Sequence, residues 1–371
     1  MPKIKGDKTF FHGKSESIGV LLVNLGTPEE PTTKSVRKYL RQFLSDSRVV
    51  EIPRLVWLPI LYALVLTRRP AASAENYKKV WSDEQGSPLL HYSLRQKKLL
   101  QQEVESRFNG PVHVELAMRY GKPNIESGLK NLQEKGARRL LVLPLYPQYS
   151  ATTTATSFDE ISKILRGWRW IPEFRFISHY HDHPSYIKAL ANSVKDHWNK
   201  QARSDLLIMS FHGLPKRNLD LGDPYYCQCL KTGRLLAEKL GLKDEQWKVT
   251  FQSRFGKAEW LKPYTDKTLM ELPSKGVKSV DIICPGFPAD CLETLEEIEH
   301  ENREYFTQAG GEEYHYIKAL NDTAPHIQVL ADLVKLHTQG WAETNPNWST
   351  SAKEKQNKQT LERAKDKGAK L

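Results

Sequence analysis

Short runs of apolar residues recur along the chain at intervals that suit strands joined by helices. In the first half they span Gly19–Asn24, Val112–Met118, Arg139–Leu143 and Phe174–His179, and in the second half Asp205–Phe211, Trp247–Gln252, Ser279–Cys284 and Glu313–Ala319. Most of these runs are continuously apolar, which is typical of strands buried on both faces of a parallel sheet. The pattern therefore predicts repeated β-α-β units.

The ends of the strands match between the two halves. Asn24–Pro28 parallels His212–Pro215, and Pro144 and Pro285 each follow a third strand. This repetition predicts an α/β fold of two similar doubly wound domains, whose parallel sheets are flanked by helices and enclose a cleft between them. Ligands of such sheets bind beyond the carboxyl ends of the strands, so the residues just after each strand are the candidates for a site.

The predicted boundaries follow from these runs and from composition. We expect the first domain at 18–172 and the second at 173–322, with a C-terminal helix at 323–338 joined to the first. Residues 1–17 are expected to form a flexible N-terminus. Residues 341–371 are rich in Lys, Gln, Asn and Ser and have little to bury, which predicts a disordered basic tail.

The charge of the chain limits the classes of partner that it is expected to bind. The 371 residues have a formal charge of +11. Residues 1–17 carry four Lys against two acids, and residues 341–371 carry seven Lys or Arg against four acids, so the ends hold +5 of it. A solvated basic surface and a contact with anionic lipid both account for this charge. We expect no nucleic-acid partner, because the basic residues form no motif with interleaved aromatics.

Cysteine usage and the N-terminus indicate a cytoplasmic protein. Four cysteines in so long a chain are no disulfide framework, so reduced thiols are expected. The first residues, MPKIKGDKTFF, lack the apolar core of a signal peptide. The oligomeric state is left open, with a monomer favoured.

The most apolar segment is Leu55–Leu66, a run of twelve residues with Arg54, Arg68 and Arg69 around it. A spanning helix needs about 20 such residues, and Pro59 interrupts this run, so we expect it not to cross a bilayer. From the residues alone, two interpretations remain. The segment is either a buried core helix or an exposed lip that touches lipid or a flat apolar ligand.

A histidine and a series of carboxylates follow the strands of the second half. His212 ends one buried strand, and Glu293 lies beyond the matching strand of the same sheet. Glu297 and Glu301 follow at spacing i, i+4, i+8, which places all three carboxylates near one face of an α-helix. The other two carboxylates of the segment are then expected to be solvated: Glu296 and Glu299. A row of carboxylates leading to an imidazole suits a path for a divalent metal ion. A structural imidazole and a plain acidic surface helix are the alternatives.

Five runs in order resemble the ferrochelatase family: Asn24–Pro28, Ala117–Gly121, Tyr146–Ser150, Ser210–Pro215 and Asp290–Leu295. Their spacing agrees as well, and the resemblance covers about residues 18–337. It implies a chelatase-like architecture of two α/β domains and an enzyme that inserts ferrous iron into a porphyrin. It also implies that the Leu55–Leu66 run is the family's hydrophobic lip, which lies at the mouth of the active site and faces the membrane.

The resemblance further implies roles for single residues. His212 matches the imidazole at the pyrrole nitrogens and Glu293 its carboxylate partner, both being catalytic and metal-binding. Glu297 and Glu301 match further members of the family's acidic row. The positions that match porphyrin-binding residues are Leu25, Arg69, Ser87, Arg119, Tyr120, Trp260 and Phe287. Those expected near the propionates are Arg69, Ser87 and Trp260.

Two positions depart from the family's pattern. Some members hold an iron–sulfur cluster through one cysteine directly after the YPQYS run, where this chain has Ala151, and three near the C-terminus, where this chain has none after Cys291. We therefore predict no iron–sulfur cluster and no other cofactor, iron being a substrate. Many relatives have His two residues before the catalytic carboxylate. Cys291 stands there instead, as either a metal-binding thiol or a buried inert one.

The expected substrates are protoporphyrin IX and ferrous iron, giving protohaem in the last step of haem biosynthesis, because the long Leu55–Leu66 run suits a poorly soluble porphyrin. Coproporphyrin is the nearest alternative, and cobalt or nickel insertion is a weaker one. A non-enzymatic haem- or porphyrin-binding protein is the alternative from another class, although a pure binder has no need of the acidic row. We expect a cytoplasmic enzyme with a peripheral contact to the inner membrane face.

Overall fold

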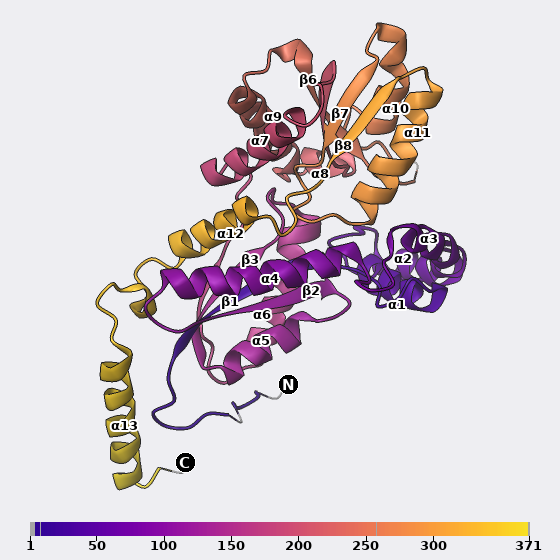
Figure 1. Cartoon of the computed structure of the whole chain (residues 1–371). Coiled ribbons are helices and arrows are strands. Elements are labelled where there is room, and N and C mark those ends of the chain that lie inside the picture. Colours follow the sequence, from indigo (N-terminus) through magenta and orange to yellow (C-terminus); the bar gives the residue numbers. More distant parts are fainter. Residues whose placement is uncertain (1–3, 8, 257, 370–371) are drawn as a thin grey trace.

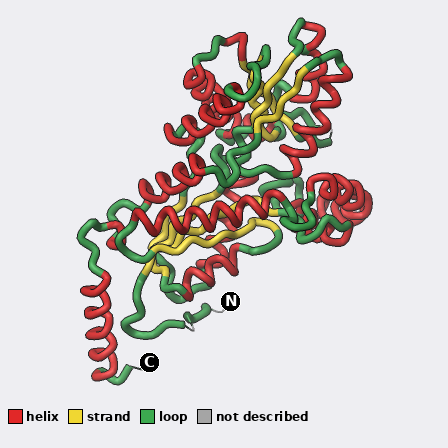
Figure 2. The backbone as a smooth tube through the Cα atoms, in the orientation of Figure 1, coloured by secondary structure: helices red, strands yellow, loops and turns green. Residues whose placement is uncertain are grey.

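The structure is a computed structural model that describes residues 4–7, 9–256 and 258–369. Figure 1 shows two α/β domains, and Figure 2 shows that each has its own sheet with helices around it. The strands of both sheets pair in parallel. The sheet orders are β2-β1-β3-β4 and β6-β5-β7-β8, which confirms the predicted fold. The strands are β1 (Ser17–Gly26), β2 (Val112–Tyr120), β3 (Ala137–Pro144), β4 (Glu173–Phe176), β5 (Leu206–His212), β6 (Trp247–Gln252), β7 (Ser279–Ile283) and β8 (Glu313–Ile317).

Helices connect the strands. The α-helices are α1 (Thr33–Leu44), α2 (Arg54–Ile60), α3 (Leu66–Val80), α4 (Pro88–Arg107), α5 (Ile125–Glu134), α6 (Thr156–Leu165), α7 (Pro184–Trp198), α8 (Lys216–Asp220), α9 (Tyr225–Leu240), α10 (Thr265–Glu271), α11 (Asn302–Gln308), α12 (Ala324–His337) and α13 (Thr350–Asp366). The π-helical segments are η1 (Leu61–Val65), η2 (Ala151–Ala155) and η5 (Glu293–Glu301), and short 3-10 turns are η3 (Asp244–Gln246), η4 (Pro273–Lys275) and η6 (Ala342–Thr344).

Strand β1 illustrates why the central strands are apolar at every position. All of its residues except Leu25 are buried. Leu22 joins the cluster that contains Leu100 of α4, whereas its neighbour Leu21 joins the cluster that contains Leu129 of α5. Because successive side chains point to opposite faces and a helix covers each face, every position of the strand before Leu25 is shielded from water.

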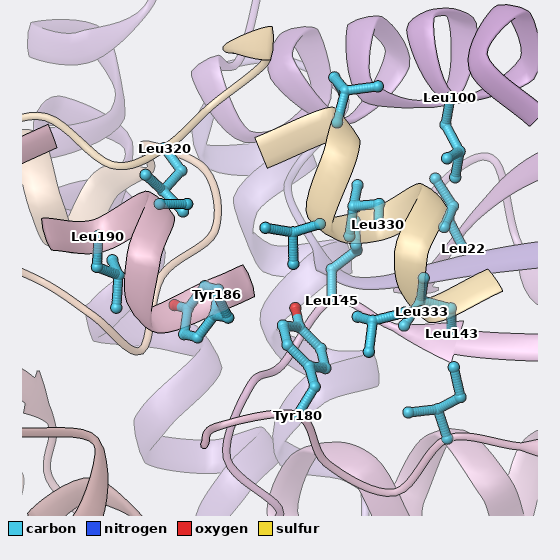
Figure 3. Packing of buried hydrophobic residues seen from close by; sticks show 14 of the residues in the cluster. Leu22, Leu100, Leu143, Leu145, Tyr180, Tyr186, Leu190, Leu320, Leu330 and Leu333 are labelled. Carbon is cyan, nitrogen blue, oxygen red and sulfur yellow. The ribbon is translucent and has the colours of Figure 1, made fainter. Parts of the chain in front are cut away.

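Helix α12 packs between the two domains. In Figure 3, Leu330 and Leu333 of this helix lie near Leu143 of the first sheet, with Tyr186 and Leu190 of α7 in the same cluster. The cluster is therefore shared by both domains, and α12 returns from the second sheet to pack on α4 of the first.

The boundary between the domains lies later than the predicted residue 172. Strand β4 pairs with β3 in the first sheet, with Arg139 opposite Glu173 and Val142 opposite Phe176. Residues 173–176 therefore belong to the first domain. The predicted boundary lies just before β4, the strand that completes the first sheet.

The predicted disordered tail at 341–371 contains helix α13. Ser349 caps it by accepting a hydrogen bond from the Ala352 backbone N–H at 3.3 Å, and no described residue of the helix is buried. Its Lys, Glu, Gln and Ala residues have high helix propensity, which an argument based on burial overlooks. Residues 370–371 of this prediction, and 1–3 and 8 of the predicted flexible N-terminus, lie outside the described residues.

The apolar run Leu55–Leu66, called the helical lip below, lies on one continuous helical segment formed by α2, η1 and α3. Leu55 is 93% exposed, and other large apolar side chains of its outer face are exposed as well: Val56, Ile60, Tyr62 and Leu64. Trp57, Leu61 and Leu66 are buried, and Leu40 and Leu44 of α1 pack against them. The segment is thus an exposed apolar surface anchored by one face rather than a core helix.

Within the described part of the chain, one helix passes a test of length and composition for crossing a membrane. It spans Arg54–Val80, and 22% of its most apolar window is buried. The twelve-residue apolar run alone is too short to span a membrane. The continuous helix has 27 residues, so length no longer excludes a membrane span. The packing of Trp57 on α1 instead ties this helix to the first domain.

Candidate active site

A cavity opens between the two domains at the carboxyl ends of the central strands. It encloses about 1260 Å³ of empty space, part of which is open to solvent. Residues at or just after the carboxyl ends of β1, β3, β5 and β7 line it, together with α1 and α3, and most of its lining residues are apolar or aromatic. This is the position at which doubly wound α/β folds bind their ligands.

His212 is the last residue of β5 and lines the cavity. Its Nδ1 lies 2.6 Å from the carbonyl oxygen of Gly213. Because a carbonyl only accepts, the proton of the neutral ring sits on Nδ1, and Nε2 keeps its lone pair. The backbone thus orients the imidazole and leaves one nitrogen as a proton acceptor.

Glu293 begins η5 and lines the same cavity as His212. It follows β7, the strand that pairs with β5, so neighbouring strands deliver the two side chains. The Gln252 side chain at the end of β6 donates to the Glu293 carbonyl at 3.0 Å and fixes the start of the segment. π-Helical turns are frequent at functional sites.

Three buried groups lie close enough to Glu293 to be affected by its charge. Burial raises the pKa of the Cys291 thiol well above its usual value, and the Glu293 carboxylate raises it further. Burial likewise raises the pKa of Tyr39 and Tyr77, again with a contribution from Glu293. All three therefore remain protonated at neutral pH. For Cys291, this favours the inert thiol over a metal-binding thiolate.

Glu297 lies one turn along η5 from Glu293, in a shell of hydrogen-bond donors. The backbone N–H of Ser253 donates to it at 2.6 Å, the Ser253 hydroxyl donates as well, and Gln252 Nε2 lies at 3.4 Å. Burial raises the pKa of Glu297 to about 7, although the Ser253 bonds act against this rise. The group therefore exchanges a proton near neutral pH.

The remaining carboxylates of η5 differ in their surroundings. Glu301 is exposed and accepts a hydrogen bond from Tyr305 at 2.5 Å. Glu296 was predicted to be solvated, but it is 8% exposed and pairs with Lys79 of α3 at 2.7 Å. That prediction was wrong because it assumed α-helical turns, whereas η5 is π-helical and its side chains advance differently around the axis.

Of the seven positions matched to porphyrin-binding residues, three line the cavity: Leu25, Ser87 and Phe287. Leu25 lies near the end of β1, Ser87 directly precedes α4, and Phe287 lies in the loop after β7. The His212 and Phe287 ring centroids are 6.4 Å apart. An apolar wall thus adjoins the imidazole.

Arg119 and Tyr120, at the end of β2, are not among the residues that line this cavity. Both donate to Asp46 Oδ2, at 2.6 Å and 2.9 Å, and Arg119 also donates to the Thr156 hydroxyl at 2.8 Å. Burial pushes the pKa of Asp46 upward, but the bond from Thr156 and the charge of Arg119 are among the effects that bring it below its usual value. These contacts tie the segment after α1 to the first sheet.

Arg69 and Trp260 also lie outside the cavity wall. The Arg69 guanidinium stacks 3.7 Å from the ring centre of Phe255 and so joins α3 to the loop after β6. Trp260 packs under the turn after His212, since a Cβ on Gly213 would lie 3.2 Å from its ring. The Trp260 indole nitrogen is buried without a hydrogen-bond partner in the described structure.

Helices supply cavity residues that no sequence motif had indicated. Tyr39 and Phe43 come from α1, and Ser73, Tyr77 and Val80 come from α3. None of them follows a strand. The rule that site residues follow the carboxyl ends of strands, which located His212 and Glu293, therefore could not identify them. Tyr146 and Gln148, which also line the cavity, lie within the YPQYS run and were marked by that motif alone.

Comparison with known sequences gives one consistent result. A family model described as Ferrochelatase matches residues 17–338. The chain is 54% identical over 368 residues to the protein named Ferrochelatase in Thioalkalivibrio sulfidiphilus, covering 99% of this chain and 100% of that protein. Over 350 residues it is 53% identical to Ferrochelatase of Pseudoalteromonas atlantica, with coverages of 94% and 97%. Ferrochelatase 2 of Shewanella oneidensis is 55% identical over 324 residues, with coverages of 87% and 98%.

Solved structures with a similar fold include two of SirB. The sirohydrochlorin chelatase SirB from Bacillus subtilis subspecies spizizenii in complex with cobalt matches with a TM-score of 0.52 at 11% identity, covering 89% of this chain and 99% of that one. SirB from Bacillus subtilis with Fe3+ matches with a TM-score of 0.50 at 12% identity, covering 89% and 100%. At this identity the likeness concerns the fold alone, a chelatase-like arrangement of two α/β domains.

Proposed function

The chain belongs to the ferrochelatase family and is an enzyme of haem biosynthesis that inserts iron into a porphyrin, and we propose that its porphyrin is protoporphyrin IX, which becomes protohaem. The observation that carries the proposal is a cavity with mostly apolar walls that His212 and Glu293 both line. Such walls suit a flat macrocycle, because burying apolar surface contributes about 25 cal/mol per Å².

His212 is the proposed acceptor of the protons that leave the pyrrole nitrogens. Insertion of a divalent ion displaces two N–H protons from the ring. A neutral imidazole is a suitable base near physiological pH; it accepts one proton at a time and passes the first to solvent before it takes the second. The bond from Nδ1 to the Gly213 carbonyl leaves Nε2 as the acceptor. The Glu293 carboxylate at the same cavity is then the group that stabilises the imidazolium.

The acidic row is the proposed path for ferrous iron. Glu301 is exposed, Glu297 is enclosed by Ser253 and Gln252, and Glu293 reaches the cavity. The series thus leads from solvent to the site of metallation. Iron(II) accepts imidazole and carboxylate ligands alike. A Glu297 group with a pKa of about 7 can exchange its proton for the incoming ion.

We further propose that the enzyme needs no resident cofactor. Ala151 stands where an iron–sulfur ligand would follow the YPQYS run. Burial raises the pKa of Cys229, Cys284 and Cys291 well above the usual value, which disfavours the thiolate form that a cluster requires. Iron–sulfur absorbance in the purified protein would contradict this proposal.

The helical lip supports protoporphyrin IX over coproporphyrin. It is continuous with α3, whose Tyr77 and Val80 line the cavity, and its outer side chains are exposed. Coproporphyrin carries four propionates and is soluble, so it gains less from an apolar surface at the mouth. We propose that the lip contacts the cytoplasmic membrane face peripherally, where a poorly soluble porphyrin partitions.

The proposal on substrate choice is tested by anaerobic assay of both porphyrins with ferrous iron. We expect kcat/KM for protoporphyrin IX to exceed that for coproporphyrin at least about tenfold, which is about 1.4 kcal/mol. A higher value for coproporphyrin would overturn the choice of substrate. Tight binding of both porphyrins without turnover of either would favour a binding protein instead.

A further inference from the structure

Two histidines and an aspartate cluster in the second domain on a face that the cavity does not use. His197 lies near the end of α7, Asp281 lies within β7, and His315 lies on β8 directly opposite Asp281 in the ladder. Nε2 of His197 and Nδ1 of His315 each lie 3.2 Å from Oδ1 of Asp281. All three atoms lie within 4.8 Å of one another.

The Asp281 carboxylate is buried without a permanent cation. It is 1% exposed, and its ion-pair partners among the residues that the structure describes are the two imidazoles, not Lys or Arg. Oδ1 also accepts the Ser204 hydroxyl at 2.9 Å, so three groups converge on one oxygen that has two lone pairs. A buried carboxylate is stabilised by a positive partner, and a cation held by both imidazoles supplies one.

The separations suit a metal ion. Two ligand atoms bound 2.0–2.1 Å from a tetrahedral ion lie about 3.3 Å apart, close to the 3.2 Å between each nitrogen and Oδ1. The imidazole planes are inclined by 60° with centroids 5.6 Å apart, so both rings can direct a nitrogen to one point. Trp198 Nε1 donates to Oδ2 at 2.7 Å and orients the carboxylate, as outer partners of metal ligands do.

We propose that His197, Asp281 and His315 bind one divalent transition-metal ion, with water or the Ser204 hydroxyl as the fourth ligand. Imidazole nitrogen with carboxylate oxygen favours ions of the Zn²⁺, Co²⁺ and Fe²⁺ group over Mg²⁺ and Ca²⁺. The two histidine side chains are 16% and 25% exposed, so an ion can enter from solvent.

The site is separate from the cavity, and its ion is not the substrate ion. Asp281 lies four residues before Pro285, which begins the loop to Glu293, and four residues of strand span about 13 Å. The ligands come from α7, β7 and β8. The bound ion therefore joins a helix to two strands and stabilises the folded second domain by mass action.

The test is titration of the purified full-length protein with Co²⁺, followed by calorimetry and by ligand-field absorption, whose intensity is high for four-coordinate ions. All proteins carry His212→Ala to weaken metal binding in the cavity. We expect one equivalent to bind, and its Kd to rise at least about 100-fold in His197→Gln and in His315→Gln, because even loss of an outer partner weakens a site about 10- to 100-fold. Glutamine keeps an N–H donor for Asp281, and circular dichroism without metal verifies the fold.

The matched control is His113→Gln, which removes a half-buried histidine from strand β2 of the first domain. It should leave the Co²⁺ stoichiometry and Kd unchanged. Failure of the parent protein to bind one equivalent would overturn the proposal without any ligand variant. Equal Kd values in the parent and both glutamine variants would overturn it as well. Neither result would bear on porphyrin metallation, which is measured separately.

Discussion

The two domains share one sheet order, yet matching positions carry different chemistry. Val23 pairs with Pro144 between β1 and β3, and the register of Met209 with Ile283, continued by two residues, places Phe211 opposite Pro285. Asn24 and His212 therefore occupy equivalent positions. Asn24 donates to Ser93 at 3.0 Å and accepts from the Leu25 backbone, so it supports a turn. His212 instead presents an imidazole to the cavity.

The segments after the third strands also match in structure and differ in chemistry. A π-helical segment follows the third strand in each domain, η2 after β3 and η5 after β7. The sequence of η2 is ATTTA, whereas η5 begins with Glu293 and contains Glu297 and Glu301. The fold thus repeats the framework, and both domains contribute apolar walls to the cavity. The groups proposed to accept protons and guide the metal come from the second domain alone.

The largest expected effect comes from giving the second domain the residue of the first. His212→Asn keeps a polar side chain but removes the base, so we expect kcat to fall about 10²- to 10⁴-fold. The porphyrin Kd should change by no more than a few-fold, because the walls remain. Steady-state assays with porphyrin fluorescence titrations measure both quantities. A variant that retains kcat within threefold would show that the two domains do not differ as described.

The pH dependence of the free energy of unfolding should differ between a variant in η5 and a variant in η2. The pKa of Glu297 is about 7 in the folded protein, whereas the ordinary pKa of a glutamate is 4.5. Between pH 4.5 and pH 7 the folded state therefore binds more protons than the unfolded state. The contribution of Glu297 to stability is therefore fully present below about pH 4.5 and is lost as the pH rises through about 7. Relative to Glu297→Gln, the free energy of unfolding should change by up to roughly 3 kcal/mol across that range.

Chemical denaturation at a series of pH values measures this difference. Thr154 of η2 is buried and cannot titrate in this range, so Thr154→Val should shift the free energy of unfolding by the same amount at every pH. A constant difference between the native protein and Glu297→Gln would contradict the raised pKa of Glu297.

The helical lip belongs to the first domain, in the long connection between β1 and β2. Leu55→Asp replaces a side chain that is 93% exposed, so the fold should be unaffected. Burial of a leucine in lipid contributes about 1.5–3 kcal/mol, and its loss should weaken binding to anionic vesicles at least about tenfold. Co-sedimentation at two salt concentrations measures the binding. Unchanged binding of the variant would argue against the lip as the contact.

A smaller effect is expected for iron uptake. A carboxylate about 8 Å from a divalent ion, one position along the proposed path, attracts it by about 1 kcal/mol at the dielectric constant of water. Glu297→Gln should therefore raise the apparent KM for ferrous iron about fivefold and leave that for porphyrin unchanged. Glu299→Gln, which removes a carboxylate outside the proposed path, is the matched control. Equal changes in both KM values would refute the metal path.

The strands and the post-strand loops were predictable because their signal is local. Continuous apolar runs such as Gly19–Asn24 mark buried parallel strands, and the fold then requires His212 and Glu293 to meet at one edge. Tyr39 and Tyr77 were not predictable, because helix periodicity does not show which helix covers a cleft. Glu296 was misplaced because a π-helix has no sequence signature comparable to that of an α-helix. Helix α13 was missed because it is stabilised by propensity and not by burial.

The most direct test of the account is a single turnover with porphyrin already bound. The native protein and His212→Ala would each be saturated with protoporphyrin IX and mixed anaerobically with ferrous iron, while porphyrin fluorescence, haem absorbance and proton release are recorded. The account predicts that the native protein loses the fluorescence and releases two protons per haem formed, and that His212→Ala binds the porphyrin but metallates it at least about 100-fold more slowly. Equal rates in the two proteins would contradict the central claim that His212 accepts the porphyrin protons.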